Sequence, residues 1–189
     1  MEIKDLIKVY DEAITQSDVN KIIMYAKSTA DFEKGKVGDD KGVDNPTIRK
    51  VFVHELHPIG KSMTQAFIYN FLKTNFFNHF FRYRQDTGSN FDMFNLNEMS
   101  ILKYLPGNFF KPHFDAGKTP IRHMSFILFL NNDYEGGELS FFNPDSKTDE
   151  LVIKVKPGRL IVWPSYWMFP HGVKPVTKGE RYAIVSWGQ

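Results

Sequence analysis

Hydrophobic residues recur at helical spacing in the first half of the chain. Ile22, Ile23 and Ala26 fall on one side of a helix predicted from Ser17 to Ser28, with Ser17 as its N-cap. A longer helix is predicted from Ser62 to Arg84, where phenylalanines form a stripe. Such a stripe is typical of a helix that packs on a sheet rather than of a surface that stacks on bases.

The segments around these two helices have other patterns. Short strands are predicted at Ile3 to Val9 and at Ile48 to Val53. Between them, Glu33 to Gly42 is rich in glycine and charge and has almost nothing to bury, which predicts a mobile loop. The wider segment from Glu33 to Asn45 is either a lid over a substrate or plain disorder.

From Asn97 onward, short hydrophobic runs alternate with turn residues such as Pro106-Gly107, Gly136-Gly137 and Asn143-Pro144. Short strands at this spacing favour a sandwich, jelly roll or barrel over a parallel sheet. The predicted strands are Glu98 to Leu105, Ile121 to Leu130, Glu138 to Phe142, Leu151 to Val155, Leu160 to Trp163, Gly172 to Val176 and Tyr182 to Trp187.

Composition narrows the class of protein. A chain of 189 residues with 42% apolar residues can form one domain with a sizeable core. The net charge of +2 disfavours nucleic acid as a partner, although a local basic run lies at Arg82 to Arg84. Cysteine is absent, which excludes disulfides and thiolate metal sites.

Met1 to Tyr10 lacks the apolar segment of a signal peptide, and no apolar run could span a bilayer, so we expect a soluble, cytoplasmic protein. The oligomeric state cannot be predicted.

Three residues in the C-terminal half form a candidate metal triad: His113, Asp115 and His171. In a strand, positions i and i+2 point to the same face, so His113 and Asp115 can converge on one ion. Two imidazoles and one carboxylate leave positions open on Fe(II). Three protein ligands also suit a catalytic zinc, so the triad alone does not name the metal. The other histidines lack comparable partners and are expected to be structural or exposed: His54, His57, His79 and His123.

Arg181 follows the second histidine and begins a strand of mostly apolar residues. Its guanidinium could sit at the solvated end of that strand. Alternatively, it could receive a carboxylate through two parallel hydrogen bonds, which lysine cannot do.

Several ordered motifs extend this pattern from Tyr104 to Trp187. They are Tyr104-Leu-Pro-Gly107 before His113-Phe-Asp115, Arg122 to Asn131, Glu135-Gly-Gly-Glu138, Pro157 to Trp163, His171-Gly-Val-Lys-Pro-Val176 and Gly179-Glu-Arg-Tyr182. In this region the chain resembles the 2-oxoglutarate- and Fe(II)-dependent dioxygenases, specifically their prolyl 4-hydroxylase-like branch.

The resemblance implies a mainly β (α+β) fold, a double-stranded β-helix or jelly roll with supporting N-terminal helices. It implies one catalytic domain over residues 1–189, in which residues 1–96 support a jelly-roll core at 97–189 that holds the metal site.

The resemblance also implies that the metal triad binds Fe(II), that Arg181 anchors the distal carboxylate of 2-oxoglutarate, and that Tyr104 helps to seat this co-substrate. Arg122 and Trp187 match positions that line the substrate side of the pocket. O2 would be the second co-substrate, and ascorbate is a further candidate cofactor. The implied reaction hydroxylates a C–H bond, with peptidyl proline as the leading substrate and a protein or peptide as the partner, and releases succinate and CO2.

Three positions depart from the family pattern. Phe129 and Leu139 stand where relatives have a tyrosine or a threonine near the distal carboxylate, and Phe110 replaces a frequent tyrosine. Which residues assist Arg181 is therefore left open, and a serine, threonine or water from elsewhere could complete its network. One alternative function is the same chemistry on a free amino acid, another protein side chain or a small metabolite. Two further alternatives are a non-catalytic jelly-roll binding module and a hydrolytic zinc enzyme.

Overall fold

The computed structural model describes residues 2–38, 42–60, 62–96, 98–117, 121–143 and 149–189. Its helical elements are the 3-10 helix η1 (Ile3–Leu6) and the α-helices α1 (Gln16–Ser28) and α2 (Met63–Thr87). The strands are β1 (Lys8–Tyr10), β2 (Glu33–Lys34), β3 (Arg49–Lys50), β4 (Phe52–Glu55), β5 (Glu98–Tyr104), β6 (Phe109–His113), β7 (Met124–Phe129), β8 (Glu135–Gly136), β9 (Leu139–Phe142), β10 (Asp149–Ile153), β11 (Leu160–Pro164), β12 (His171–Val173), β13 (Val176–Lys178) and β14 (Arg181–Gly188).

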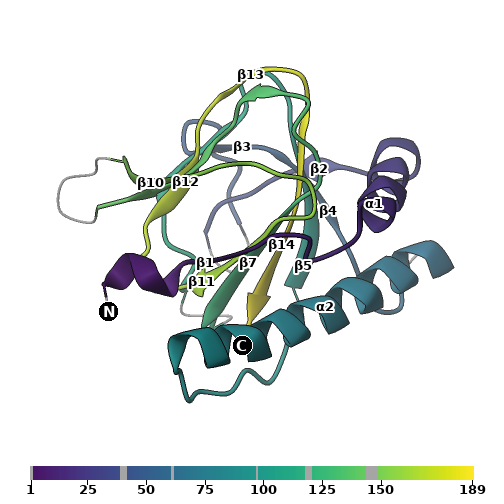
Figure 1. The fold of residues 1–189 in the computed structure, drawn as a ribbon. Helices are drawn as coiled ribbons and strands as arrows, with labels where there is room; N and C mark the ends of the chain where they lie inside the picture. The colour runs from purple at the N-terminus through teal and green to yellow at the C-terminus, as the bar shows by residue number, and fades with distance from the viewer. Residues whose placement is uncertain (1, 39–41, 61, 97, 118–120, 144–148) are drawn as a thin grey trace.

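The strands form two main sheets, and neighbouring strands within each sheet are antiparallel. The larger sheet has the order β1-β11-β7-β14-β5-β4-β2, and the smaller one has the order β10-β9-β12-β6-β3. A separate ribbon joins β13 to β8. The predicted double-stranded β-helix is confirmed, with α2 running across one face of the larger sheet (Figure 1).

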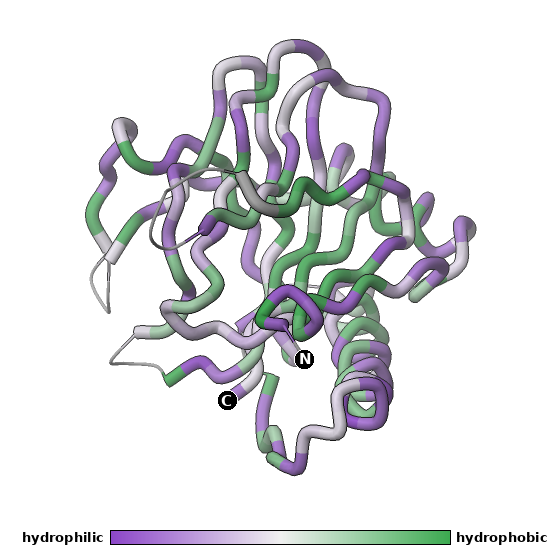
Figure 2. The backbone as a smooth tube through the Cα atoms, turned by 60° about the vertical axis from the view of Figure 1, so that its left-hand side comes forward, coloured by the Kyte–Doolittle hydropathy of each residue, from purple (hydrophilic) through white to green (hydrophobic). Residues whose placement is uncertain are grey.

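Side chains that alternate along each central strand of the larger sheet point into two separate hydrophobic cores, one on each face of the sheet. In β14, Ala183 and Val185 point into the inner core between the sheets, while Tyr182 and Ile184 join the outer core beneath the helices. The other central strands alternate in the same way, because successive side chains in a strand point to opposite faces. Both faces of these strands are therefore apolar, and Figure 2 shows the long hydrophobic stretches that result.

Helix α2 closes the outer core. Ser62 caps its N-terminus by accepting a hydrogen bond from the Gln65 backbone, and Gly88 ends it in a left-handed conformation at φ 68°. Within the phenylalanine stripe, the Phe76 ring stacks on Phe126 of β7 with centroids 5.4 Å apart. The predicted packing of this helix on a sheet is confirmed.

Several predicted element boundaries are wrong. The N-cap of α1 is Thr15, whose side chain accepts from the Asp18 backbone, and not Ser17. Most of the strand predicted at Ile3 to Val9 is the 3-10 helix η1. The strand predicted at Ile48 to Val53 is two strands in different sheets, because β3 pairs with β6 and β4 pairs with β5.

The loop predicted from Glu33 to Gly42 is also partly structured. Its first residues form β2, and Val37 makes an antiparallel bridge with Val43. Residues 39–41 of this segment, and Pro144 of the Asn143-Pro144 turn, lie outside the described residues. No helix within the described ranges is both long enough and apolar enough to cross a membrane.

Candidate metal centre

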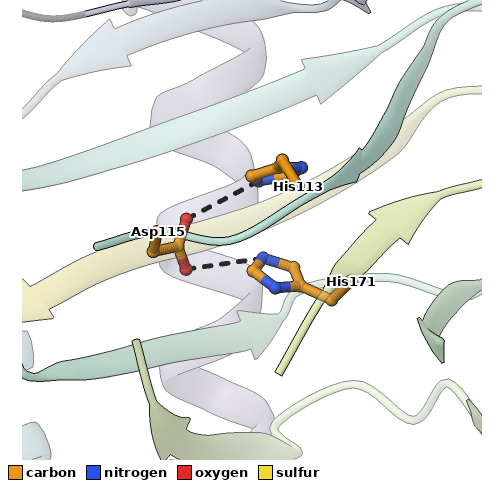
Figure 3. Close-up of side chains that lie close together, drawn as sticks. All are labelled: His113, Asp115 and His171. Atoms are coloured by element: carbon orange, nitrogen blue, oxygen red, sulfur yellow. Dashed lines mark ion pairs between the residues drawn. The ribbon is translucent and has the colours of Figure 1, made fainter. Parts of the chain in front are cut away.

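Strand pairing in the smaller sheet brings two of the predicted ligands together. In the β12–β6 ladder His171 lies directly opposite His113. β6 ends at His113, so the prediction that Asp115 lies in the same strand is wrong, but Asp115 still turns toward both histidines (Figure 3). One ligand atom from each of the three residues lies within 4.8 Å of the others.

The imidazole tautomers suit a metal ion. Nδ1 of His113 lies 2.9 Å from the Lys111 carbonyl oxygen, and Nδ1 of His171 lies 3.1 Å from that of Phe169. A carbonyl oxygen only accepts, so each Nδ1 carries the proton and each Nε2 presents a lone pair. These atoms face Asp115 oxygens at 3.6 Å and 3.4 Å. Lone pairs and a carboxylate that converge in this way need a cation between them, so the three residues fit a metal ion.

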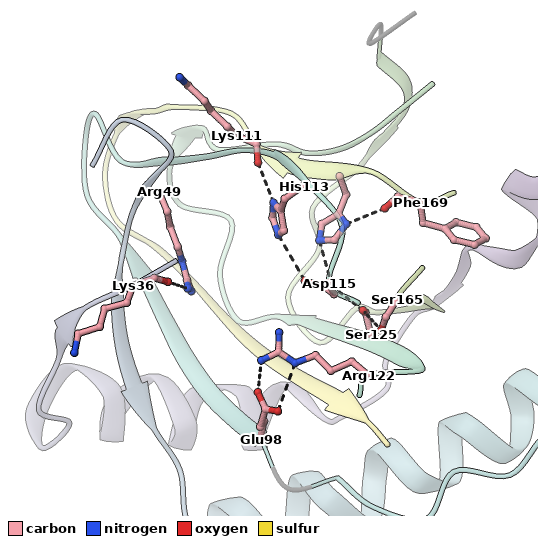
Figure 4. Close-up of polar contacts among 11 residues, drawn as sticks. Lys36, Arg49, Glu98, Lys111, His113, Asp115, Arg122, Ser125, Ser165 and Phe169 are labelled. Atoms are coloured by element: carbon pink, nitrogen blue, oxygen red, sulfur yellow. Dashed lines mark hydrogen bonds and ion pairs between the residues drawn. The ribbon is translucent and has the colours of Figure 1, made fainter. Parts of the chain in front are cut away.

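Two serines that the sequence interpretation missed orient the carboxylate. Ser125 donates a hydrogen bond of 2.6 Å to Oδ2 of Asp115, and Ser165 lies 2.8 Å from the Ser125 hydroxyl (Figure 4). Both serines are buried. Burial alone would raise the pKa of Asp115, but the fields of the two histidines and the Ser125 hydrogen bond outweigh it and lower that pKa. Burial lowers the pKa of His171 to about 4. At neutral pH the site therefore offers an ionised carboxylate and a neutral His171.

Aromatic rings surround the two histidines. The Phe110 ring stacks on His113 with centroids 3.5 Å apart, and Trp163 meets His171 edge-on at 4.9 Å. Phe141 contacts both Trp163 and His171. These walls exclude water from one side of the site, which strengthens electrostatic interactions inside it.

The remaining histidines of the chain lie away from the triad or have protein partners, as expected. His54 is buried and lies 2.9 Å from the Tyr25 hydroxyl, whereas His57 is exposed beside Glu55. His123 contacts the Tyr166 hydroxyl, and His79 faces the Asn75 carbonyl.

Arg181 lies inside the molecule and not at a solvated strand end. It is the first residue of β14 and lies two positions before Ala183, so its side chain points to the same face of the strand, into the inner core. Only 1% of its surface is exposed. Its guanidinium carbon lies 4.9 Å from the Tyr104 ring and 5.5 Å from the Phe129 ring. None of its three side-chain nitrogens has a hydrogen-bond partner among the described residues. A buried cation without partners costs several kcal/mol, so this arrangement calls for an anion.

Tyr134 is a second polar group beside this arginine, and the sequence interpretation did not single it out. Burial raises the pKa of its phenol, and the nearby Arg181 guanidinium opposes that rise. The buried hydroxyl has no hydrogen bond of normal geometry, either to Arg181 or to another described group. A Cβ placed on Gly137 would lie 3.0 Å from Cδ of Arg181 and 3.3 Å from the Tyr134 ring, so glycine is required at this tight packing point.

The predicted substrate-side residues lie next to each other at the open side. Arg122 forms an ion pair with Glu98, and its guanidinium carbon lies 3.8 Å from the Trp187 ring centre. Both residues line a cavity of about 630 Å³ that also contains the metal triad and Tyr104. The structure therefore brings together all of the site residues predicted from the sequence, with Arg181 behind the cavity wall.

Comparison with protein families adds a decisive observation. Residues 99–189 match the model of the 2OG-Fe(II) oxygenase superfamily, and this range contains the metal triad, Tyr104, Tyr134 and Arg181. This segment of the chain belongs to the 2OG-Fe(II) oxygenase superfamily. Members of this superfamily use Fe(II), 2-oxoglutarate and O2, which agrees with the ligand types at the triad.

Individual relatives agree with this assignment. Over 66 residues the chain is 48% identical to prolyl 3-hydroxylase 2 of Homo sapiens, a match that spans 35% of this chain and 9% of the human protein. The chain thus corresponds to a small part of the curated relatives that it matches.

Solved structures match nearly the whole chain. A prolyl hydroxylase from Trichoplax adhaerens, in complex with a hypoxia inducible factor peptide fragment, has a TM-score of 0.75 at 18% identity and covers 97% of this chain and 83% of its own. A prolyl-4-hydroxylase from Pseudomonas putida has a TM-score of 0.73 at 18% identity, over 97% of this chain and 92% of its own. The fold is therefore that of the prolyl-hydroxylase-like branch.

Proposed function

We propose that this chain is an Fe(II)- and 2-oxoglutarate-dependent dioxygenase that hydroxylates proline residues in a protein or peptide. The observation that carries the proposal is the convergence of His113, Asp115 and His171 within 4.8 Å near a buried arginine, Arg181, whose side-chain nitrogens have no hydrogen-bond partner among the described residues. A 2-oxo acid with a second, distal carboxylate requires a metal site for one end and an anion site nearby for the other.

The chain contributes the geometry of the metal site. Nε2 of each histidine and the Asp115 carboxylate would hold Fe(II), while the carbonyls of Lys111 and Phe169 fix the imidazole tautomers. Bound iron, with 2-oxoglutarate and O2, supplies the oxidation of an unreactive C–H bond and releases succinate and CO2. The rings of Phe110, Trp163 and Phe141 would shield this chemistry from water.

Arg181 and Tyr134 together would hold the distal carboxylate of 2-oxoglutarate. The guanidinium offers N–H donors in a planar fork, and the Tyr134 hydroxyl is buried beside it; neither group has a hydrogen-bond partner of normal geometry within the described ranges. Tyr134 thus provides the hydroxyl that Phe129 and Leu139 cannot provide. Tyr104 would seat the same co-substrate, since its ring lies between the metal cavity and Arg181.

The shape of the open side supports a peptide substrate rather than a free amino acid. The metal cavity adjoins a second cavity of about 500 Å³, and Arg49, Arg122 and Trp187 line both. A free proline would fill little of this space, whereas an extended peptide could occupy both cavities. Arg122 and Trp187 would contact the residue that is hydroxylated.

We also propose that the chain acts as a single catalytic domain. β1, β3 and β4, which lie before residue 97, pair with β11, β6 and β5 of the later part. The early segment would thus support the site directly, and its described part near Gly38 and Gly42 would cover the substrate as a lid, since both glycines line the metal cavity. Ascorbate as an additional cofactor stays a prediction.

The proposed function is tested by incubating the protein anaerobically with Fe(II), 2-oxoglutarate and proline-containing peptides and then admitting O2. We expect peptide-dependent succinate formation and the gain of one oxygen atom in the peptide by mass spectrometry. Amino-acid analysis of the product separates 3-hydroxyproline from 4-hydroxyproline. Turnover with free proline but not with peptides would favour the small-molecule reading. A protein that binds neither Fe(II) nor 2-oxoglutarate would contradict the proposal.

A further inference from the structure

Arg49 faces the substrate side of the metal cavity and has no counter-ion in the part of the chain that the structure describes. Arg49 lies on β3, opposite Phe110 of β6. Its guanidinium carbon lies 4.8 Å from the centre of the Phe110 ring, and that ring is the one that stacks on His113. One aromatic ring therefore connects this arginine to a metal ligand.

The hydrogen bonds of Arg49 are incomplete. Within the described part of the chain, Nη1 donates to the Lys36 carbonyl oxygen at 2.7 Å (Figure 4), whereas Nε is buried and has no partner. The backbone at Gly35 covers Nε, since a Cβ placed there would lie 3.2 Å from it. A guanidinium has five N–H donors, so most of this capacity is left for another molecule.

The charges near Arg49 do not neutralise it. Arg122 already pairs with Glu98, and the Asp115 carboxylate belongs to the metal triad. None of the described carboxylates forms an ion pair with Arg49. Burial lowers the pKa of its guanidinium, with partial compensation from Tyr104 and Asp115. A partly buried cation that keeps its charge gains most from an anion that arrives with a ligand.

Arg49 and Arg181 belong to different sites. Arg181 is enclosed in the inner core behind Tyr104, whereas Arg49 lines both the metal cavity and the adjoining cavity. An anion at Arg49 therefore comes from the substrate and not from the distal end of 2-oxoglutarate.

We propose that Arg49 binds a carboxylate of the substrate, so that the site selects peptides with an acidic group close to the hydroxylated residue. This inference rests on the proposed peptide hydroxylation. The carboxylate can be an Asp or Glu side chain or the C-terminus of the peptide, and both have the same chemistry toward a guanidinium.

The test uses peptides that carry one target proline with Glu or Gln scanned through the flanking positions, each with a free or an amidated C-terminus. The wild type should prefer Glu at one position, or the free C-terminus, by about ten- to hundredfold in kcat/KM, mostly through KM. Arg49→Gln should reduce this ratio to near one, and Arg49→Lys should retain part of it. Lys50→Gln is the matched control, since it removes an exposed charge from the same strand.

Binding separates failure of this inference from failure of the proposed function. Affinity of the same peptides for Mn(II)- and 2-oxoglutarate-loaded protein is measured by fluorescence anisotropy, so acidic preference is visible without turnover. Hydroxylation of neutral and acidic peptides at equal rates would overturn the role of Arg49 alone. An increased Kd for 2-oxoglutarate in Arg49→Gln would place the residue in the co-substrate site and also overturn it. If no peptide is hydroxylated but acidic peptides bind through Arg49, the proposed function fails, whereas the binding of a peptide carboxylate by Arg49 stands.

Discussion

Nε2 of His171 lies 3.4 Å from Oδ2 of Asp115, although neither atom carries a hydrogen toward the other at neutral pH. The proton of His171 is on Nδ1, which faces the Phe169 carbonyl, so an acceptor nitrogen faces an acceptor oxygen. Such a contact is unfavourable without a cation. This contact between two acceptor atoms is therefore stronger evidence for a metal site than the proximity of two histidines and an aspartate alone.

Replacing one ligand should strongly weaken metal binding. We expect His171→Ala to weaken Fe(II) or Mn(II) binding by more than about a hundredfold, because two remaining ligands cannot hold the ion in a fixed geometry. Isothermal titration calorimetry with Mn(II) measures this without turnover. The matched control is His57→Ala, because His57 is exposed and pairs only with Glu55 among the described residues. Equal metal affinity in both variants would rule out the triad.

Ser125 should tune the metal affinity through Asp115. Ser125→Ala removes the hydroxyl that donates to Oδ2, so the carboxylate loses its fixed orientation, and metal affinity should fall by about 10- to 100-fold. Ser140→Ala is a suitable control, because the Ser140 hydroxyl is equally buried but has no hydrogen-bond partner among the residues that the structure describes. If the two variants bind metal equally well, Ser125 has only a packing role.

Arg181 and Tyr134 should both contribute to 2-oxoglutarate affinity. We expect Arg181→Ala to cost about 2–5 kcal/mol of binding free energy, because it removes a buried charge partner. Tyr134→Phe should cost about 1.5–3 kcal/mol, since it removes one hydrogen bond to a carboxylate. Both values follow from 2-oxoglutarate titrations of the Mn(II)-loaded protein.

Tyr182→Phe provides the matched control for Tyr134→Phe. Tyr182 lies on the opposite face of β14 from Arg181, and its hydroxyl donates to Glu180. Its loss should leave 2-oxoglutarate affinity unchanged. An unchanged affinity in Tyr134→Phe as well would leave Arg181 without the helper proposed for it.

The metal-free protein should lose stability as the pH falls below 7. The pKa of His171 is about 4 when folded and 6.5 ordinarily, so between these values the unfolded chain binds more protons than the folded chain. Stability is therefore present above pH 6.5 and is lost toward pH 4, by about 2 kcal/mol between pH 7 and pH 5. Asp115, whose pKa is lowered on folding, acts in the same direction at more acidic pH.

Urea denaturation of the metal-free protein at several pH values measures this effect. Replacing His171 by Gln should flatten the pH dependence in this window, whereas the exposed His57→Gln should leave it unchanged. A wild-type protein that is equally stable at pH 7 and pH 5 would show that His171 titrates normally.

The sequence determined the types of residue at the site and the class of fold. The spacing of His113 and Asp115, the later His171 and Arg181, and the glycine-containing turns were sufficient for the family and for most central strands, because these features are local. Alternation along a strand is also local, and it already fixes Arg181 on the same face as Ala183.

Only the tertiary structure brought together the residues that we propose complete the site. Ser125, Tyr134 and Arg49 are common residue types at their positions, and their proposed roles depend on neighbours that only the folded chain places beside them: Asp115, Arg181 and Phe110. The break between β3 and β4 also depends on two different sheets competing for one segment. Hydrogen bonding, burial and missing counter-ions are properties of packed neighbours, and for that reason a pattern along one chain could not reveal them.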